Sequence, residues 1–328
     1  MKEATVRAHA NIALVKYWGK RDEELILPMN GSISMTIDRF YVTTHIIFDD
    51  RLSADSLVLN GTVASRSDHK RISKFLDLVR VLADTNAHAA IRSINCVPTA
   101  AGLSSSSAAY AALATAATLA LGLRLAPTEL SKLARQGSGS AARSIYGGFV
   151  EWLMGTRNDG NDCYAVPLAS ANDWNLYVVV VIVDEGSKPI SSREGMRRVV
   201  ATSPLYADWL NTVESDLKVA RTAIQQHDLP ALGHVAEANA LRMHATTMEA
   251  DPPFTYWLRA TIEVIHRVQN LRTKEIQAYA TIDAGPNVVV LCEQKCVAFV
   301  QDAVSSVKGV KQMLVAGPGP GVREMSDL

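Results

Sequence analysis

The residues of this chain that could do chemistry are cations, small hydroxyls and one isolated carboxylate. Lys16 and Lys20 lie beside two aromatic residues in ANIALVKYWGKRD, and Arg143 stands between small residues in QGSGSAARSIYGG. Asp283 comes directly before Ala-Gly-Pro-Asn in TIDAGPNVVVL. Cations that neutralise phosphates, together with a carboxylate that orients a hydroxyl, suit phosphoryl transfer.

Four consecutive serines, Ser104–Ser107, stand before an alanine-rich run in VPTAAGLSSSSAAYAALATAATLALGL. Alanine and leucine predict a helix over residues 108–123. The first turn of a helix has free N–H groups and binds anions, and Gly102 lets the backbone approach a ligand closely. A capped core helix is the alternative, but capping needs only one serine. The run is neither a Walker A loop nor a GxGxxG motif.

Three other motifs also have purely structural explanations. SSREGM, at residues 191–196, has the spacing of a capping box and predicts a second helix start, with Lys188 just before it. Arg143 could reach a carboxylate or phosphate with both arms of its guanidinium, or be a surface arginine at a helix start. Asp283 could be a catalytic carboxylate or a turn-former.

Composition and charge narrow the possible functions. The chain has 328 residues, 48% of them hydrophobic, and equal numbers of basic and acidic residues, 33 of each. This composition supports a large core, and the length is typical of two domains. A neutral chain has no overall field that favours nucleic acid or an anionic membrane, so any anion must bind to a local cluster.

The spacing of the cysteines and the composition of the first residues indicate the cellular compartment of the protein. Cys96, Cys163, Cys292 and Cys296 form no CxxC pair, so we expect reduced thiols and neither zinc nor a disulfide framework. The N-terminus lacks the apolar region of a signal peptide. The longest apolar run, residues 176–183, is too short to cross a bilayer, which takes about 20 residues. We therefore expect a cytoplasmic protein.

The elements that must position these residues alternate between helices and strands. Hydrophobic spacing predicts helices near 69–85, 204–226 and 255–271, and apolar runs predict buried strands at 176–183 and 288–292. The chain is therefore expected to be an α/β or α+β protein. The boundary between two domains is expected near residue 185, giving ranges 1–185 and 186–328.

Seven motifs in order resemble one known family. They are ANIALVKYWGKRD, LPMNGSISMT, PTAAGLSSSSA, GSGSAARSIYGG, SSREGM, TSPLYADW and DAGPN, which span residues 10–287. The serine motif resembles the phosphate-binding motif of the GHMP kinase superfamily. The other motifs are similar to those of its diphosphomevalonate decarboxylase branch. Small departures occur at Gly31, Ala142 and Ile282, and none removes a charged residue.

The resemblance implies an activity and roles for individual residues. The reaction would be the ATP- and Mg²⁺-dependent decarboxylation of mevalonate 5-diphosphate to isopentenyl diphosphate, through phosphorylation of the 3-hydroxyl. The implied catalytic residues are Asp283, Lys16 and Arg143. The implied substrate contacts are Tyr17, Lys20, Ser138, Ser140, Arg143, Ser191, Ser192 and Arg193. The implied ATP contacts are Gly102, Ser104, Ser105, Ser106, Ser107 and Lys188, with Ser107 as the Mg²⁺ ligand.

The resemblance also implies a fold and leaves rivals open. The expected fold is the two-domain GHMP kinase fold, with a ribosomal-protein-like N-terminal domain, a ferredoxin-like C-terminal domain and the active site in the cleft between them. The last strand is expected to return to the N-terminal domain, and the chain to form a homodimer. A phosphomevalonate decarboxylase, a mevalonate 3-kinase and a non-catalytic metabolite sensor are the alternatives. A sensor is expected to have lost Asp283.

Overall fold

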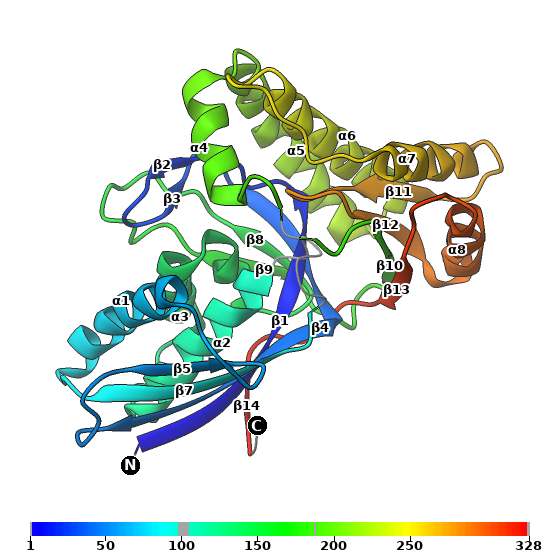
Figure 1. Cartoon of the computed structure of the whole chain (residues 1–328). Coiled ribbons are helices and arrows are strands. Elements are labelled where there is room, and N and C mark those ends of the chain that lie inside the picture. Colours follow the sequence, from blue (N-terminus) through cyan, green and yellow to red (C-terminus); the bar gives the residue numbers. More distant parts are fainter. Residues whose placement is uncertain (1, 98–104, 187, 327–328) are drawn as a thin grey trace.

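A computed structural model describes residues 2–97, 105–186 and 188–326 of the chain. Two mixed layers of helices and strands lie one above the other in Figure 1, joined by the long strands β1 (Lys2–Val15) and β4 (Ser32–Asp49). Gly102 and Ser104, two of the expected ATP contacts, lie outside the described residues.

In the described ranges, eight strands form the larger sheet, in the order β14-β1-β4-β7-β5-β6, with β8 beside β4 and β9 beside β8. Only β5 and β7 pair in parallel among the neighbours described. The other strands of this sheet are β5 (Ser56–Leu59), β6 (Thr62–Val63), β7 (His88–Asn95), β8 (Phe149–Trp152), β9 (Ala165–Ala169) and β14 (Arg323–Met325). A separate hairpin consists of β2 (Lys20–Asp22) and β3 (Leu27–Pro28).

The helices α1 (Arg66–Ala83), α2 (Ser105–Ala120) and α3 (Pro127–Gly137) lie along this sheet, followed by the 3₁₀ helix η1 (Gly139–Ile145). Eight alanine, leucine and tyrosine side chains of α2 fill a core against β1 and β4, because an alanine-rich helix can approach a sheet closely. The prediction of a helix in this part of the chain is confirmed, and Gly122, with φ of +79°, follows its end.

Four antiparallel strands form the second sheet of the described chain, in the order β11-β12-β10-β13. They are β10 (Leu176–Ile182), β11 (Ala278–Thr281), β12 (Val288–Glu293) and β13 (Gln312–Ala316). Its helices are α4 (Ser192–Thr202), α5 (Tyr206–Gln226), α6 (Leu229–Met248), α7 (Arg259–Arg272), η2 (Gln294–Cys296) and α8 (Val297–Ser305). The predicted buried strands correspond to β10 and β12, and three predicted helices correspond to α1, α5 and α7.

The sheets divide the chain at a different place from residue 185. The strand β10 was expected in the N-terminal part, but its hydrogen-bonded neighbours are β12 and β13, so it belongs to the second sheet. Near the other end, β14 pairs with β1, with Thr5 opposite Met325. Both ends of the described chain therefore lie beside the larger sheet, close together in Figure 1. None of the described helices has the length and apolar character needed to cross a membrane.

Candidate active site

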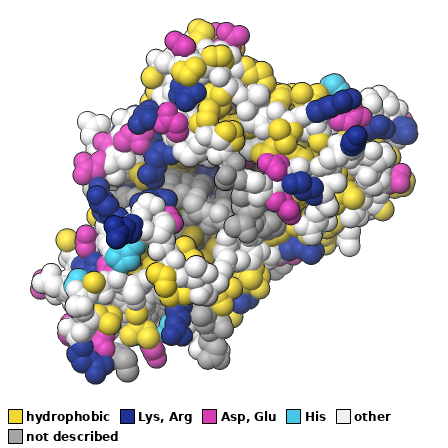
Figure 2. All heavy atoms as spheres, in the orientation of Figure 1, with side chains coloured by type: hydrophobic (Ala, Val, Ile, Leu, Met, Phe, Trp, Pro, Cys, Tyr) yellow, Lys and Arg dark blue, Asp and Glu magenta, His cyan; other side chains and the backbone are white. Residues whose placement is uncertain are grey.

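A cavity of about 460 Å³ lies where the two layers meet, and most of the candidate residues line it. Figure 2 shows this face of the molecule hollowed, with Lys and Arg side chains along one rim. The sequence candidates on its wall are Lys16, Tyr17, Lys20, Ser105, Ser106, Ser138, Ser140, Arg143, Lys188, Ser191, Ser192, Arg193 and Asp283. Segments up to 267 residues apart in the sequence are thus brought together.

The catalytic candidates Lys16 and Asp283 form an ion pair. Lys16 follows the last residue of β1, and its Nζ donates to Asp283 Oδ1 at 2.6 Å and to the carbonyl oxygen of Ala13 at 2.8 Å. The lysine side chain is 2% exposed and the aspartate 19%. Burial lowers the pKa of Lys16, and the charge of Asp283 opposes that shift. A buried ammonium therefore faces a carboxylate that is open to the cavity.

Arg143, on η1, is a buried cation held by neutral groups. Its Nη1 donates to Ser32 Oγ at 2.6 Å, its Nε to Ser34 Oγ at 2.9 Å and its Nη2 to Asn11 Oδ1 at 3.1 Å. The residue is 2% exposed, so the alternative of a surface arginine is wrong. Burial lowers the pKa of Arg143 to about 10, against the opposing charge of Asp283. A guanidinium in such a position is ready for an anionic ligand.

The residues that hold Arg143 were not predicted from the sequence, although the pattern of residues 30–36 indicated two of them. The alternation of Ser32 and Ser34 with apolar residues in NGSISMT places both hydroxyls on one face of β4. Asn11 gave no such signal, because it is one of several polar residues along β1. Arg71 on α1 also lines the cavity and was not among the candidates.

Two helix N-termini open at the cavity. The helix α2 begins at Ser105, and Ser106 Oγ lies 3.2 Å from Ser138 Oγ across the cavity wall. The helix α4 begins after Ser191, whose side chain accepts from the N–H of Glu194, as the capping-box spacing predicts. The N-terminal ends of the two helix dipoles add partial positive charge to the same space.

The position of Ser107 differs from that of its neighbours. Its side chain is fully buried in α2 and does not line the cavity, whereas Ser105 and Ser106 do. Successive residues of a helix point about 100° apart, so a run of serines cannot all face one ligand. The assignment of Mg²⁺ to Ser107 stays a prediction.

Lys188 and Tyr17 lie on the wall with few partners of their own. Lys188 Nζ donates to Ser192 Oγ at 3.3 Å, and burial lowers its pKa. The Tyr17 hydroxyl is buried and has no hydrogen-bond partner among the described residues, and burial raises its pKa. An unsatisfied hydroxyl at a polar cavity is available to a ligand.

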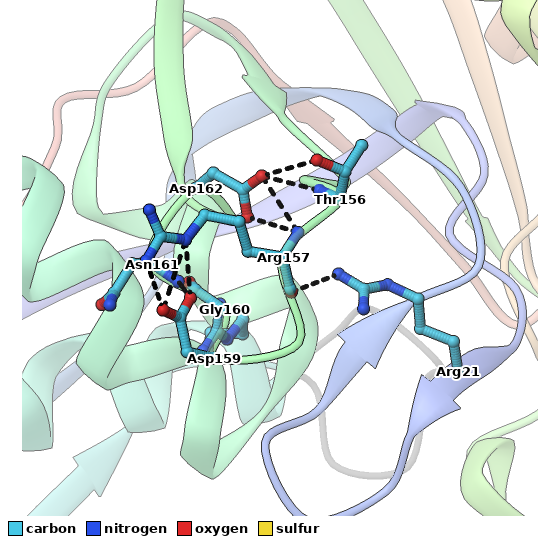
Figure 3. A network of polar contacts seen from close by, with 8 residues as sticks. Arg21, Thr156, Arg157, Asp159, Gly160, Asn161 and Asp162 are labelled. Carbon is cyan, nitrogen blue, oxygen red and sulfur yellow. Dashed lines mark hydrogen bonds and ion pairs between the residues drawn. The ribbon is translucent and has the colours of Figure 1, made fainter.

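Lys20 lines the cavity from the β2–β3 hairpin. The loop of residues 155–162 forms hydrogen bonds with that hairpin. Figure 3 shows Arg21, next to Lys20, directed at the loop of residues 155–162. Its Nη2 donates to the carbonyl oxygen of Arg157 at 3.1 Å. The Asp162 carboxylate accepts from the N–H groups of Thr156 and Arg157, which fixes the loop. Arg21 thus connects the hairpin to this loop.

The charge on the cavity wall is unbalanced. Among the described lining residues, the cations are Lys16, Lys20, Arg71, Arg143, Lys188 and Arg193, and the carboxylates number one, Asp283. Lys20 is also paired with the exposed Glu23 outside the wall. Such a surface attracts a ligand with several negative charges.

His244, on α6, is buried near the ion pair of Lys16 and Asp283. Its pKa allows the effect of burial in this region to be tested. Neither ring nitrogen makes a hydrogen bond of good geometry among the described residues, although the backbone of residues 282–283 lies beside the ring. Burial, with a smaller contribution from the charge of Lys16, lowers the pKa of His244 from 6.5 to about 3. The imidazole is therefore neutral in the folded protein at ordinary pH.

We expect His244 to make the protein less stable in mild acid. Between pH 6.5 and 3 the unfolded chain takes up a proton that the folded chain does not, so the free energy of unfolding falls as pH falls. At pH 5 the loss is about 2 kcal/mol. Urea unfolding at pH 8 and pH 5 should show a smaller loss for His244→Gln than for the wild type. His266→Gln, at an exposed position on α7, is the control, and equal losses in all three proteins would contradict the prediction.

Comparisons with known proteins agree with this site. A family model described as the diphosphomevalonate decarboxylase-like N-terminal domain matches residues 8–165, and one for the mevalonate 5-diphosphate decarboxylase C-terminal domain matches residues 178–316. The diphosphomevalonate decarboxylase of Candida albicans is 34% identical, over 100% of this chain and 99% of its own length.

Solved structures give the same result. The structure of MDDEF in complex with MVAPP, AMPPCP and magnesium is 46% identical, with a TM-score of 0.92 and 98% of each chain covered. The mevalonate diphosphate decarboxylase of Staphylococcus aureus is 44% identical, with a TM-score of 0.95, covering 99% of this chain and 98% of its own. The fold is shared with these structures, the two family models match most of the chain, and the cationic cavity contains Lys16 and Asp283. The chain therefore belongs to the diphosphomevalonate decarboxylase family.

Proposed function

We propose that this protein catalyses the ATP- and Mg²⁺-dependent decarboxylation of (R)-5-diphosphomevalonate to isopentenyl diphosphate. The observation that carries the proposal is the cavity wall, which has six cations and one carboxylate, Asp283, and the pairing of that carboxylate with the buried Lys16 at 2.6 Å. Both substrates are polyanions, and such a wall neutralises them. The relative MDDEF, in its complex with MVAPP, AMPPCP and magnesium, binds ligands of this kind.

Asp283 is assigned to the 3-hydroxyl of the substrate, as the base or orienting group. The hydroxyl oxygen attacks the γ-phosphorus of ATP, ADP leaves, and the hydroxyl proton goes to the carboxylate. Lys16 holds Asp283 in place through Nζ and contributes positive charge next to the transferring phosphoryl group. Lys188 and the N-terminus of α2 supply further positive charge for the phosphates.

Arg143 is assigned to the substrate carboxylate. When the C3–O bond breaks, its electron pair leaves with phosphate, and positive charge develops at C3. The C1–C2 bond then supplies the electrons of the new double bond, and C1 departs as CO₂. Asp283 can stabilise this positive charge once it has passed the proton to the departing phosphate and is ionised again. Tyr17, Lys20, Ser138, Ser140, Ser191, Ser192 and Arg193 are assigned to the diphosphate and carboxylate of the substrate.

The hydroxyls at the mouth of α2 fit a magnesium ion that is bound together with ATP. Mg²⁺ prefers oxygen ligands, and it commonly takes one or two from the protein and the rest from phosphates and water. Ser105 and Ser106 present such oxygens at the wall, and Ser107 lies behind them. When bound there, the ion would neutralise phosphate charge.

Three further parts of the proposal concern the whole molecule. We assign the two sheets to two domains, in keeping with the separate ranges matched by the two family models. A cytoplasmic location is supported by the four free thiols at Cys96, Cys163, Cys292 and Cys296. The homodimer implied by the resemblance stays a prediction, which sedimentation equilibrium would test.

One assay tests the function against its rivals. The purified protein is incubated with ATP, Mg²⁺ and either the mono- or the diphosphate of mevalonate, and ADP and CO₂ are measured together. We expect equal amounts of ADP and CO₂ with the diphosphate. ADP without CO₂ would instead indicate a 3-kinase, and preference for the monophosphate a phosphomevalonate decarboxylase. Binding without either product would indicate a sensor.

A further inference from the structure

The peptide groups on both sides of Lys16 are held by buried asparagine side chains. Strand β1 ends at Val15, so Lys16 lies just outside the ladder of the sheet. Asn239 Oδ1 accepts from the N–H of Lys16 at 2.8 Å, and Asn30 Nδ2 donates to its carbonyl oxygen at 2.7 Å. Asn239 is 0% exposed and Asn30 is 4% exposed. Because a buried peptide group without a partner is costly, these bonds fix where the lysine side chain begins.

Asn239 itself can face in only one direction. Its Nδ2 donates to Asp216 Oδ2 at 2.7 Å, and Arg242 Nη2 donates to both oxygens of the same carboxylate, at 2.8 and 2.9 Å. Asp216 is 7% exposed. An ionised carboxylate accepts hydrogen bonds and cannot donate them, so the NH₂ group of Asn239 must face Asp216. Its carbonyl oxygen must then face Lys16.

These residues lie between the two sheets that supply the catalytic pair. Asn239 and Arg242 are on α6, which packs against β1 of the larger sheet and against β11 of the second, and Asp216 is on the neighbouring α5. Lys16 follows β1, and Asp283 follows β11. A rigid amide on α6 therefore sets the position of Lys16 relative to the element that carries Asp283.

We propose that Asn239, oriented by Asp216 and Arg242, is a positioning residue that aligns Lys16 with Asp283 for catalysis. None of the three lines the cavity, so they act through Lys16 and not on the substrate. The inference rests on the proposed function, since it assigns Lys16 to the same reaction.

Steady-state kinetics of Asn239→Ala and Asp216→Asn test the inference. A shift of the catalytic groups by a fraction of an ångström costs rate without weakening ground-state binding, so we expect kcat to fall about tenfold or more in Asn239→Ala. Asp216→Asn keeps the shape but no longer dictates the amide orientation, and a smaller loss is expected. The KM values for ATP and diphosphomevalonate should stay within about twofold of the wild type.

Glu151→Gln is the matched control. Glu151, on β8, is a buried carboxylate that receives Arg221 of α5 at 2.7 and 2.8 Å, and it therefore also links α5 to the larger sheet. It does not contact Lys16 or line the cavity. The control should lose thermal stability and keep its kcat. An equal fall of kcat in the control, or a change confined to KM, would mean that Asn239 is only structural and would overturn the proposal.

A crystal structure of Asn239→Ala separates this inference from the proposed function. An inactive wild-type protein in the ADP and CO₂ assay would contradict the function but would not bear on the alignment. In the crystal, we expect the distance between Lys16 Nζ and Asp283 Oδ1 to increase from 2.6 Å. An unchanged distance would overturn the positioning role, whatever the assay shows.

Discussion

Asp283→Asn is expected to reduce turnover by about three orders of magnitude or more, because it removes the assigned base and leaves the size of the side chain unchanged. The amide neither accepts a proton nor balances the charge of Lys16, although its oxygen can still accept a hydrogen bond from Lys16 Nζ. Single-turnover formation of ADP and CO₂ measures the loss. Binding of ATP and diphosphomevalonate, by calorimetry, should stay within about threefold.

The control for this prediction is Asp184→Asn. Asp184 is also near the second sheet and is paired with a lysine, Lys311, at 3.2 Å, but it does not line the cavity. Its activity should match that of the wild type. Full activity in Asp283→Asn would remove the aspartate from the reaction and leave the cationic wall as the source of catalysis.

Arg143→Lys is expected to have the second-largest effect. Lysine retains the charge but not the two-armed geometry that Ser32, Ser34 and Asn11 hold in place. Loss of a charged, bidentate contact with the substrate carboxylate costs about 2–3 kcal/mol, so kcat/KM for diphosphomevalonate should fall about 30- to 150-fold. The Kd for ATP should not change.

Arg135→Lys is its matched control. Arg135 is also 2% exposed, and its Nη1 donates to the carbonyl oxygens of Gly160 and Cys163 at 2.9 and 2.7 Å, away from the cavity. We expect a loss of stability and near-normal kinetics there. A defect in Arg143→Lys that affects ATP affinity alone would place the arginine at the nucleotide instead of the substrate.

The sequence was informative where a property is local. Apolar runs correctly predicted β10 and β12, and the spacing of Ser191 and Glu194 predicted the start of α4, because each depends on residues a few positions apart. The approximate ranges of α1, α5 and α7 followed from their periodicity, whereas α6 was not predicted. The fold class followed from the motifs and is confirmed by the solved relatives.

Properties that depend on distant partners could not be predicted. Arg143 looked equally like a surface residue, since Asn11 and Ser32, which bury it, are 132 and 111 positions away. The expected boundary near residue 185 gave no indication that β10 joins the second sheet, because a strand's sheet is decided by its neighbours and not by its own residues. The sequence around Asn239 does not indicate its role, because that role depends on the hydrogen bond from the distant Lys16.

The pairing of β14 with β1 joins a strand that is synthesised early to one that is synthesised late. Thr5 emerges from the ribosome long before Met325, its partner across the sheet. At translation speeds of about 5–20 residues per second, this delay is roughly 16–64 s. During that time one edge of β1 is an unpaired strand edge, the kind of edge that recruits other chains. This edge of the nascent protein therefore stays open until residues 323–325 have been made.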